Sequence, residues 1–204
     1  MSNRKSKMDP LKIIEKYYDT QSEAYRILVK HSRSVADKAI SIAKALSRTK
    51  TLPAENDLPL ENTMYTELDT RFIEEAAMLH DIGVFLCNAP EIDCHGTYRY
   101  LCHGYLGADL LRKEGYPRHA LVCERHTGTG ISRKMIEDGN LPLPNRDLLP
   151  VTPEEQLICF ADKFFSKTKL NKEKSIGKVQ ESISKYGEES ILRFNHWCKL
   201  FLVK

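Results

Sequence analysis

Apolar residues recur at three- and four-residue spacing along almost the whole chain, and alternating, strand-like runs are nearly absent. The longest helical pattern runs from about residue 22 to 47, with Ile27, Val35 and Ile42 on one stripe. Shorter patterns follow at about 69–81, 103–115, 117–126 and 152–169, and two more close the chain. Because each stripe must be buried against other helices, we predict an all-α fold.

Helix boundary signals agree with this pattern. Asp9 stands before Pro10, and Thr152 before Pro153 with Glu155 three residues on, which is typical of helix N-termini. Gly83 follows the 69–81 pattern, where we expect it to act as a left-handed cap.

The chain has 204 residues, enough for one well-buried domain. We expect an N-terminal segment with a short helix at 1–20, the main helical domain at 21–170, and a helical extension at 171–204 packed on the same domain. Residues 48–68 hold two prolines and resemble a loop or insertion. The last helix carries Phe194 and Phe201 on one face, which could pack on the core or against a second subunit as a homodimer.

Composition limits the partners. Charged residues make up 29% of the chain and the net charge is only +3, which does not favour nucleic acid. No stretch approaches the roughly 18 apolar residues of a membrane span, and the basic start leads into no signal peptide. The six cysteines form no CxxC pair, so we expect reduced thiols in a cytoplasmic protein rather than a cysteine zinc site.

The most informative feature is a set of ionisable residues on inward-facing stripes. A lone histidine on such a face is usually a satisfied core residue, but unpaired buried carboxylates are costly. A metal centre would explain the whole set, because it stabilises carboxylates and accepts neutral imidazole nitrogens. The set comprises His31, His80, Asp81, His103, His126 and Asp162.

In this order the set resembles the HD superfamily of metal-dependent phosphohydrolases. "LHDIG" at 79–83 is similar to the central motif of that family. "HGYLGADLL", "ERHTGTG" and "CFADK" are similar in order and spacing to the small HD proteins that hydrolyse diadenosine tetraphosphate. The resemblance runs from about residue 25 to 168 and implies an HD-domain helical bundle.

Carried over by position, the resemblance implies that one metal is held by His31, His80, Asp81 and Asp162, and a second by His103 and His126, with Asp81 bridging. It implies one or two divalent transition metals, with iron or manganese favoured and zinc, cobalt or nickel possible. A metal-activated water would then attack phosphorus, and Asp81 would be catalytic as the bridging ligand.

Substrate contacts are weaker predictions. Many relatives carry a lysine just after the central motif, but Val84 and Phe85 stand here. Lys163 after Asp162 could reach a phosphate, or could be a solvated lysine. His95 could protonate a leaving group, or lie on a surface loop. The other candidates are Thr127 and Gly128, which could equally be an ordinary helix cap, and Arg133, which could lie on a solvated face.

We therefore predict a cytoplasmic metal-dependent phosphohydrolase that acts on a small phosphorylated substrate, most simply a nucleotide. Two alternatives stay open. One is an HD-type di-iron oxygenase, which the same ligands would permit. The other is a non-catalytic nucleotide-binding regulatory module.

Overall fold

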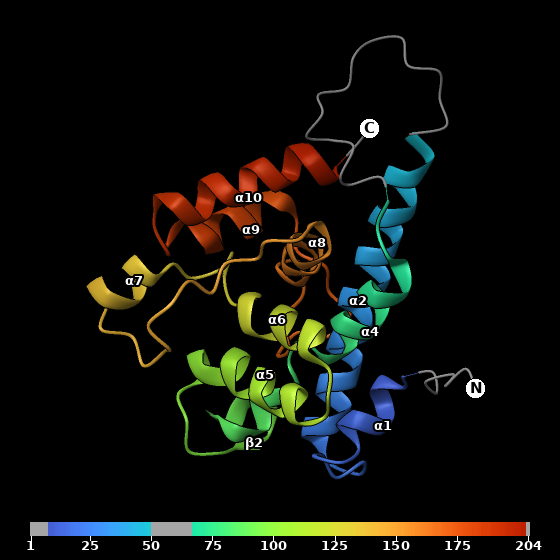
Figure 1. Cartoon of the computed structure of the whole chain (residues 1–204), viewed down its shortest axis with the longest axis vertical. Coiled ribbons are helices and arrows are strands. Elements are labelled where there is room, and N and C mark those ends of the chain that lie inside the picture. Colours follow the sequence, from blue (N-terminus) through green and yellow to red (C-terminus); the bar gives the residue numbers. More distant parts are fainter. Residues whose placement is uncertain (1–7, 50–66, 203–204) are drawn as a thin grey trace, which may run out of the picture.

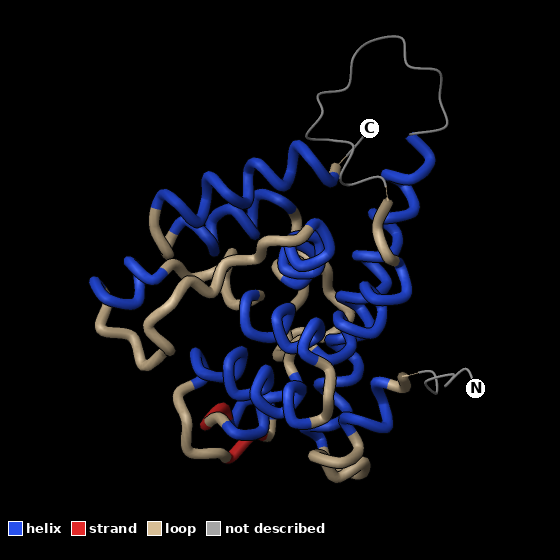
Figure 2. Tube along the Cα trace, viewed as in Figure 1, coloured by secondary structure: helices blue, strands red, loops and turns tan. Residues whose placement is uncertain are grey.

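The computed structural model describes residues 8–49 and 67–202. Within them the chain is a bundle of helices with one two-stranded antiparallel sheet, which confirms the all-α prediction (Figure 2). The α-helices are α1 (Pro10–Ile14), α2 (Glu23–Thr49), α4 (Thr70–Leu79), α5 (His103–Lys113), α6 (Pro117–Arg125), α7 (Arg133–Asp138), α8 (Pro153–Asp162), α9 (Ile176–Ser184) and α10 (Glu188–Phe201). Between α4 and α5 come the 3-10 turns Ile82–Leu86, Pro90–Ile92 and Tyr100–Cys102, and the strands β1 (Asn88–Ala89) and β2 (Cys94–His95).

Side-chain caps begin several helices. Asp9 accepts a hydrogen bond from the Leu11 amide, and Thr152 accepts one from the Glu155 amide, as their positions predict. The helix predicted at 152–169 ends earlier, at Asp162. Most of the loop predicted at 48–68 lies outside the described residues.

Gly83 corrects one prediction, because it is not a left-handed cap. It lies inside the 3-10 turn that follows α4, and its φ is not positive. A Cβ at this position would lie 2.3 Å from the His103 carbonyl oxygen and 2.5 Å from the Gly107 nitrogen. Glycine is needed because the backbone after the "HD" pair touches the backbone of α5.

The long helix α2 packs along α4, and α5 packs against α6 (Figure 1). Helix α8 lies between these layers and α9–α10, which cover the far side of the bundle (Figure 1). Its Phe160 ring lies 5.3 Å, centroid to centroid, from both Phe194 and Phe201 of α10. Those two rings are buried in the core of their own chain, so this stripe is not available to a second subunit.

No helix among the described residues is long and apolar enough to cross a membrane. All six cysteines are free thiols, and five of them are buried. Two of these thiols support the site described next: the Cys123 thiol donates to the His80 carbonyl, and the Cys159 thiol donates to the His126 carbonyl.

Candidate metal centre

Helix ends bring most of the ionisable set together. His80 caps the C-terminus of α4 and Asp81 follows it. His103 begins α5, His126 follows α6, and Asp162 is the last residue of α8. The long helix α2 contributes His31 from its middle. All four histidines and Asp81 are buried.

Asp81 divides the cluster into two halves. Its Oδ2 lies 3.1 Å from His31 Nε2 and 3.0 Å from His80 Nε2. Its Oδ1 lies 3.3 Å from the Nε2 atoms of both His103 and His126. One carboxylate therefore faces a separate pair of imidazole nitrogens with each oxygen.

Asp162 completes the first half. Its Oδ1 lies 3.0 Å from His31 Nε2 and 3.5 Å from His80 Nε2. We call the group of His31, His80, Asp81 and Asp162 the first half-site. The group of Asp81, His103 and His126 is the second half-site.

Three of the histidine rings are held by backbone carbonyl groups. His80 Nδ1 lies 2.6 Å from the Ala77 oxygen, His103 Nδ1 2.6 Å from the Tyr100 oxygen, and His126 Nδ1 2.7 Å from the Cys123 oxygen. Each carbonyl lies three residues before its histidine, at the end of a helix or helical turn. A proton on Nδ1 satisfies that carbonyl and leaves Nε2 as the free lone pair, which is how metal-binding histidines are usually oriented.

The remaining polar atoms fit a cation. His31 Nε2, His80 Nε2 and both oxygens of Asp81 are buried and make no hydrogen bond to the described chain, although Lys167 forms an ion pair with Asp81. In each half-site the candidate ligand atoms lie within 4.8 Å of one another. Buried carboxylate oxygens and imidazole nitrogens that converge in this way are costly unless cations bind them, so this donor set fits divalent metal ions.

The histidines of the two half-sites differ in pKa. Burial lowers the pKa of His103 to about 3 and also lowers the pKa of His126, so both imidazoles are neutral near pH 7. Burial opposes the charged form of His80 too, but the Asp81 and Asp162 carboxylates outweigh it and raise the pKa of His80 to about 9. Without a cation His80 is therefore protonated near pH 7, and a metal would bind its Nε2 by displacing that proton. Burial would likewise raise the pKa of Asp81, yet the His80 and Lys167 charges hold it well below its usual range.

Two lysines line the cluster. Lys163 Nζ lies 2.8 Å from Asp162 Oδ2 and donates to the His126 carbonyl at 3.0 Å. Lys167 Nζ lies 2.6 Å from Asp81 Oδ2. The sequence prediction included Lys163 and missed Lys167. The signal was present in "DKFFSK", where the two lysines stand four residues apart after the aspartate.

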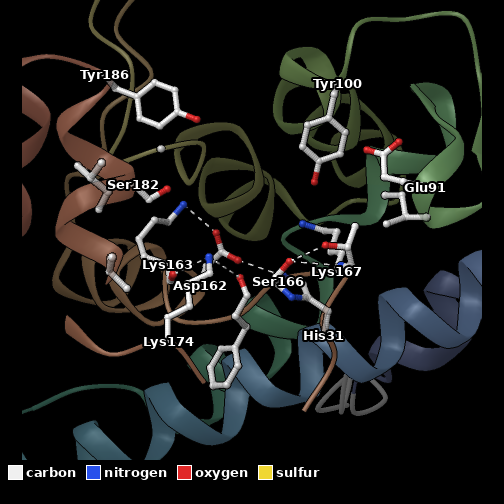
Figure 3. Close-up of a pocket in the computed structure, with 16 residues that line it drawn as sticks. His31, Glu91, Tyr100, Asp162, Lys163, Ser166, Lys167, Lys174, Ser182 and Tyr186 are labelled. Carbon is white, nitrogen blue, oxygen red and sulfur yellow. Dashed lines mark hydrogen bonds and ion pairs between the residues drawn. The ribbon is translucent and has the colours of Figure 1, made fainter. Parts of the chain in front are cut away.

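A cleft opens above the cluster, in two lobes of about 330 and 400 Å³. The first lobe reaches His31 and the second reaches His103 and His126. Three predicted substrate contacts line this cleft: Thr127, Gly128 and Lys163. The lobes share Tyr100, Gly128, Asp162, Lys163, Lys167 and Tyr186 (Figure 3 draws the first lobe).

Two predicted residues are not brought to the cleft. His95 stands on β2 with its side chain 66% exposed and its Nε2 3.2 Å from Asp93 Oδ1. Arg133 is exposed on α7 and pairs with Glu137 at 2.8 Å. Neither lines the cleft. Both residues fit the alternative interpretation given above, an exposed surface position, because each pairs with a local carboxylate.

The model of one protein family, the HD domain, matches residues 28–166, which is more than half of the chain. The chain belongs to the HD domain family. The matched region contains every residue of both half-sites, and the helical fold agrees with it.

The relatives of this HD domain protein among curated proteins include the following three. An uncharacterized protein of Methanocaldococcus jannaschii is 35% identical over 128 residues, covering 58% of this chain and 68% of that protein. A tRNA (cytidine(56)-2'-O)-methyltransferase of Thermoplasma volcanium is 29% identical over 165 residues, covering 80% of this chain and 37% of that enzyme. The enzyme of the same name from Picrophilus torridus is 35% identical over 103 residues, covering 50% of this chain and 26% of that enzyme.

This chain therefore spans well under half the length of the two methyltransferases. No solved structure matches it.

Proposed function

We propose that this protein is a metal-dependent phosphohydrolase that cleaves a phosphoanhydride or phosphoester of a nucleotide. The observation that carries the proposal is Asp81, whose two oxygens face separate pairs of buried imidazole nitrogens at the floor of a cleft. The ligands would be His31, His80, Asp81 and Asp162 for one metal, and Asp81, His103 and His126 for the other. The mixed nitrogen and oxygen donors suit iron, manganese, zinc, cobalt or nickel. The resemblance to the HD superfamily favours iron or manganese among them.

Divalent metals in such a site supply Lewis acidity and a water whose pKa is lowered towards 7. The chain's own residues then have three tasks. Asp81 holds the two half-sites at a fixed separation. Lys163 and Lys167 place positive charge at the mouth of the cluster, where it stabilises the anionic phosphate oxygens. The Thr127 hydroxyl, which lines the same cleft, can donate a hydrogen bond to the phosphate.

Lys163 and Lys167 are suited to this task by their charge. Burial disfavours the ammonium form of both, but nearby carboxylates outweigh it and raise both pKa values, that of Lys167 well above its ordinary value. Both lysines are therefore cationic at neutral pH. Many relatives carry a lysine just after the central motif, where this chain has Val84 and Phe85. In this chain Lys167 provides a positive charge beside Asp81 instead.

The names of two relatives include tRNA methylation. We do not extend methyl transfer to this chain, because it matches only 37% and 26% of those two enzymes. The substrate is expected to be a small molecule, and diadenosine tetraphosphate is one member of the class to be tested.

The test is a phosphate-release screen on protein purified without chelator and supplied with iron(II) or manganese. The panel contains nucleoside mono-, di- and triphosphates, dinucleoside polyphosphates, cyclic nucleotides and sugar phosphates. Release by the natural protein that Asp81→Asn abolishes would support the proposal. Oxygen uptake without phosphate release would instead establish the di-iron oxygenase alternative, and nucleotide binding without turnover would establish the regulatory module.

A further inference from the structure

The two lobes of the cleft differ in chemistry, and the metal cluster lies between them. The first lobe is lined by His31 and Asp162 of the first half-site. The second lobe is lined by His103 and His126 of the second half-site. A substrate that fills both lobes must therefore pass over the cluster.

The first lobe is the more cationic of the two. Lys163 and Lys167 line both lobes, and Lys174 lines the first lobe only (Figure 3). The hydroxyl-bearing side chains of Ser166, Thr168 and Ser182 also line the first lobe. Glu91 stands at its rim and is the one carboxylate besides Asp162 among its lining residues. A cavity with three ammonium groups and several hydroxyl donors suits a chain of phosphates.

Lys174 is the informative member of this lobe. Its Nζ donates to the Lys163 carbonyl at 3.3 Å and to the Phe165 carbonyl at 3.4 Å, which fixes the ammonium beside the cavity. Within residues 8–49 and 67–202 it forms no ion pair with a carboxylate, whereas Lys163 and Lys167 each pair with a candidate metal ligand. Its charge is therefore available to an anion that extends beyond the metal ligands.

The second lobe is largely apolar away from the cluster. Asp162, Lys163 and Lys167 line the side that it shares with the first lobe, and Leu101, Ile131, Met135 and Leu141 line the rest of its wall together with residues near His126. These four apolar side chains belong to a small hydrophobic cluster around α7 that is separate from the main core. Tyr100 stands at the junction of the lobes, 38% exposed. An apolar cavity of about 400 Å³ with an aromatic edge is within the size range of small-molecule pockets and suits a planar, weakly polar group.

We infer that the cleft binds a nucleoside di- or triphosphate with its base in the apolar lobe, its α-phosphorus over the cluster and its outer phosphates on the lysines. This inference rests on the proposed function and names its substrate class and the bond that breaks. The α-phosphorus is the one phosphorus that lies between an apolar group and a phosphate chain. The opposite placement, with the terminal phosphate over the cluster, would put an anion beside Lys163 and Lys167 but leave Lys174 without one.

The reaction balances as a hydrolysis. The oxygen of water forms a bond to the α-phosphorus, and the bond from that phosphorus to the oxygen bridging to the β-phosphorus breaks. The bridging oxygen leaves with the electron pair, and the protons of the attacking water pass to solvent or to the leaving phosphate. A triphosphate gives a nucleoside monophosphate and pyrophosphate, and a diphosphate gives the monophosphate and phosphate. Lys174 and its neighbours stabilise the departing anion.

The first experiment measures binding rather than turnover. Manganese-loaded protein is titrated with the α,β-methylene analogues of ATP and CTP, with inorganic tripolyphosphate and with the corresponding monophosphates. Lys174→Gln should raise the Kd of the analogues and of tripolyphosphate about 10-fold and leave the monophosphates unchanged. Met135→Gln should raise the Kd of at least one analogue and its monophosphate by a similar factor, and leave tripolyphosphate unchanged.

Matched controls are Lys178→Gln, an exposed lysine in the neighbouring groove, and Leu192→Gln, an exposed leucine on α10. Neither should change any Kd, and melting temperatures verify that all four variants fold. If Lys174→Gln and Met135→Gln changed the Kd values of the same probes, or of none, the assignment of the lobes would be overturned.

The second experiment identifies the bond. Hydrolysis in water enriched in oxygen-18 should place the label in the monophosphate and none in the released pyrophosphate or phosphate. Nucleoside diphosphate plus labelled phosphate would overturn the inference and leave the proposed function intact. Conversely, if the two substitutions changed the Kd values as predicted but no substrate were hydrolysed, the assignment of the lobes would stand and the proposed function would be overturned.

Discussion

The two half-sites share Asp81 but differ in charge. The first has two histidines, Asp162 and one oxygen of Asp81, whereas the second has two histidines and the other oxygen alone. The histidines differ as well, because the pKa of His80 is raised to about 9 while that of His103 is lowered to about 3. More carboxylate oxygens bind a divalent cation more tightly, so we expect the first half-site to fill first and the second to exchange its metal more readily.

Asp81→Asn should have the largest effect, because it removes the one group common to both half-sites. We expect metal affinity to fall by more than the roughly 10- to 100-fold typical of changes around a metal site, with hydrolysis abolished. Metal content after dialysis, measured by mass spectrometry, checks this. Asp93→Asn, an exposed aspartate paired with His95, is the control. An Asp81→Asn protein that kept two metals would disprove the bridging role.

His126→Gln separates the half-sites. Only the second half-site loses a ligand, so we expect one tightly bound metal per chain to remain, whereas His31→Gln should weaken the tighter site. Calorimetric titration with manganese gives both stoichiometries, and His196→Gln on the exposed side of α10 is the control. If the two substitutions reduced the amount of bound metal equally, the two metals would bind as one cooperative unit rather than at two unequal sites.

Lys167→Met should move binding and turnover in opposite directions. Removing the ammonium that contacts Asp81 Oδ2 relieves its repulsion of a cation, so metal affinity should rise. Phosphate release should fall roughly 100-fold, because a fixed positive charge beside the phosphate is lost. Titration and steady-state kinetics on the same preparation measure both quantities, with exposed Lys169→Met as control. A fall in both would assign Lys167 to supporting the metal ligands instead.

The smallest effects should come from His95→Gln and Arg133→Gln. Both side chains are exposed and face local carboxylates away from the cleft. Metal content and turnover should stay within about twofold of the natural protein, because surface substitutions away from special features are usually neutral. A larger loss of turnover with His95→Gln would restore it as a candidate proton donor.

Much of the site was predictable because its signal is local. A histidine or aspartate at helical spacing from apolar neighbours must face inward, and His80, His103 and His126 do so. The resemblance to the HD superfamily then identified these residues as candidate metal ligands. Sequence spacing also located Thr127 and Lys163 at the cleft, since they adjoin His126 and Asp162.

The differences between the sequence predictions and the structure have a common origin. Gly83 was interpreted from its own neighbours, but its role is set by the backbone of α5, which is distant from it in sequence order. His95 lies between two ligand-bearing helices in sequence, yet the turn through β1 and β2 exposes it. Lys167 was missed because it follows the end of α8, where no periodicity indicates a direction.

The sequence by itself determined the helices, the inward-facing ionisable set and the family, because helical periodicity and short motifs depend on neighbours along the chain. Only the tertiary structure decided that Asp81 faces a different histidine pair with each oxygen, and that one lobe of the cleft is the more cationic and the other largely apolar away from the cluster. These properties depend on how α2, α5, α6 and α8 pack around the end of α4. Packing at that scale is fixed by the whole core rather than by any one segment.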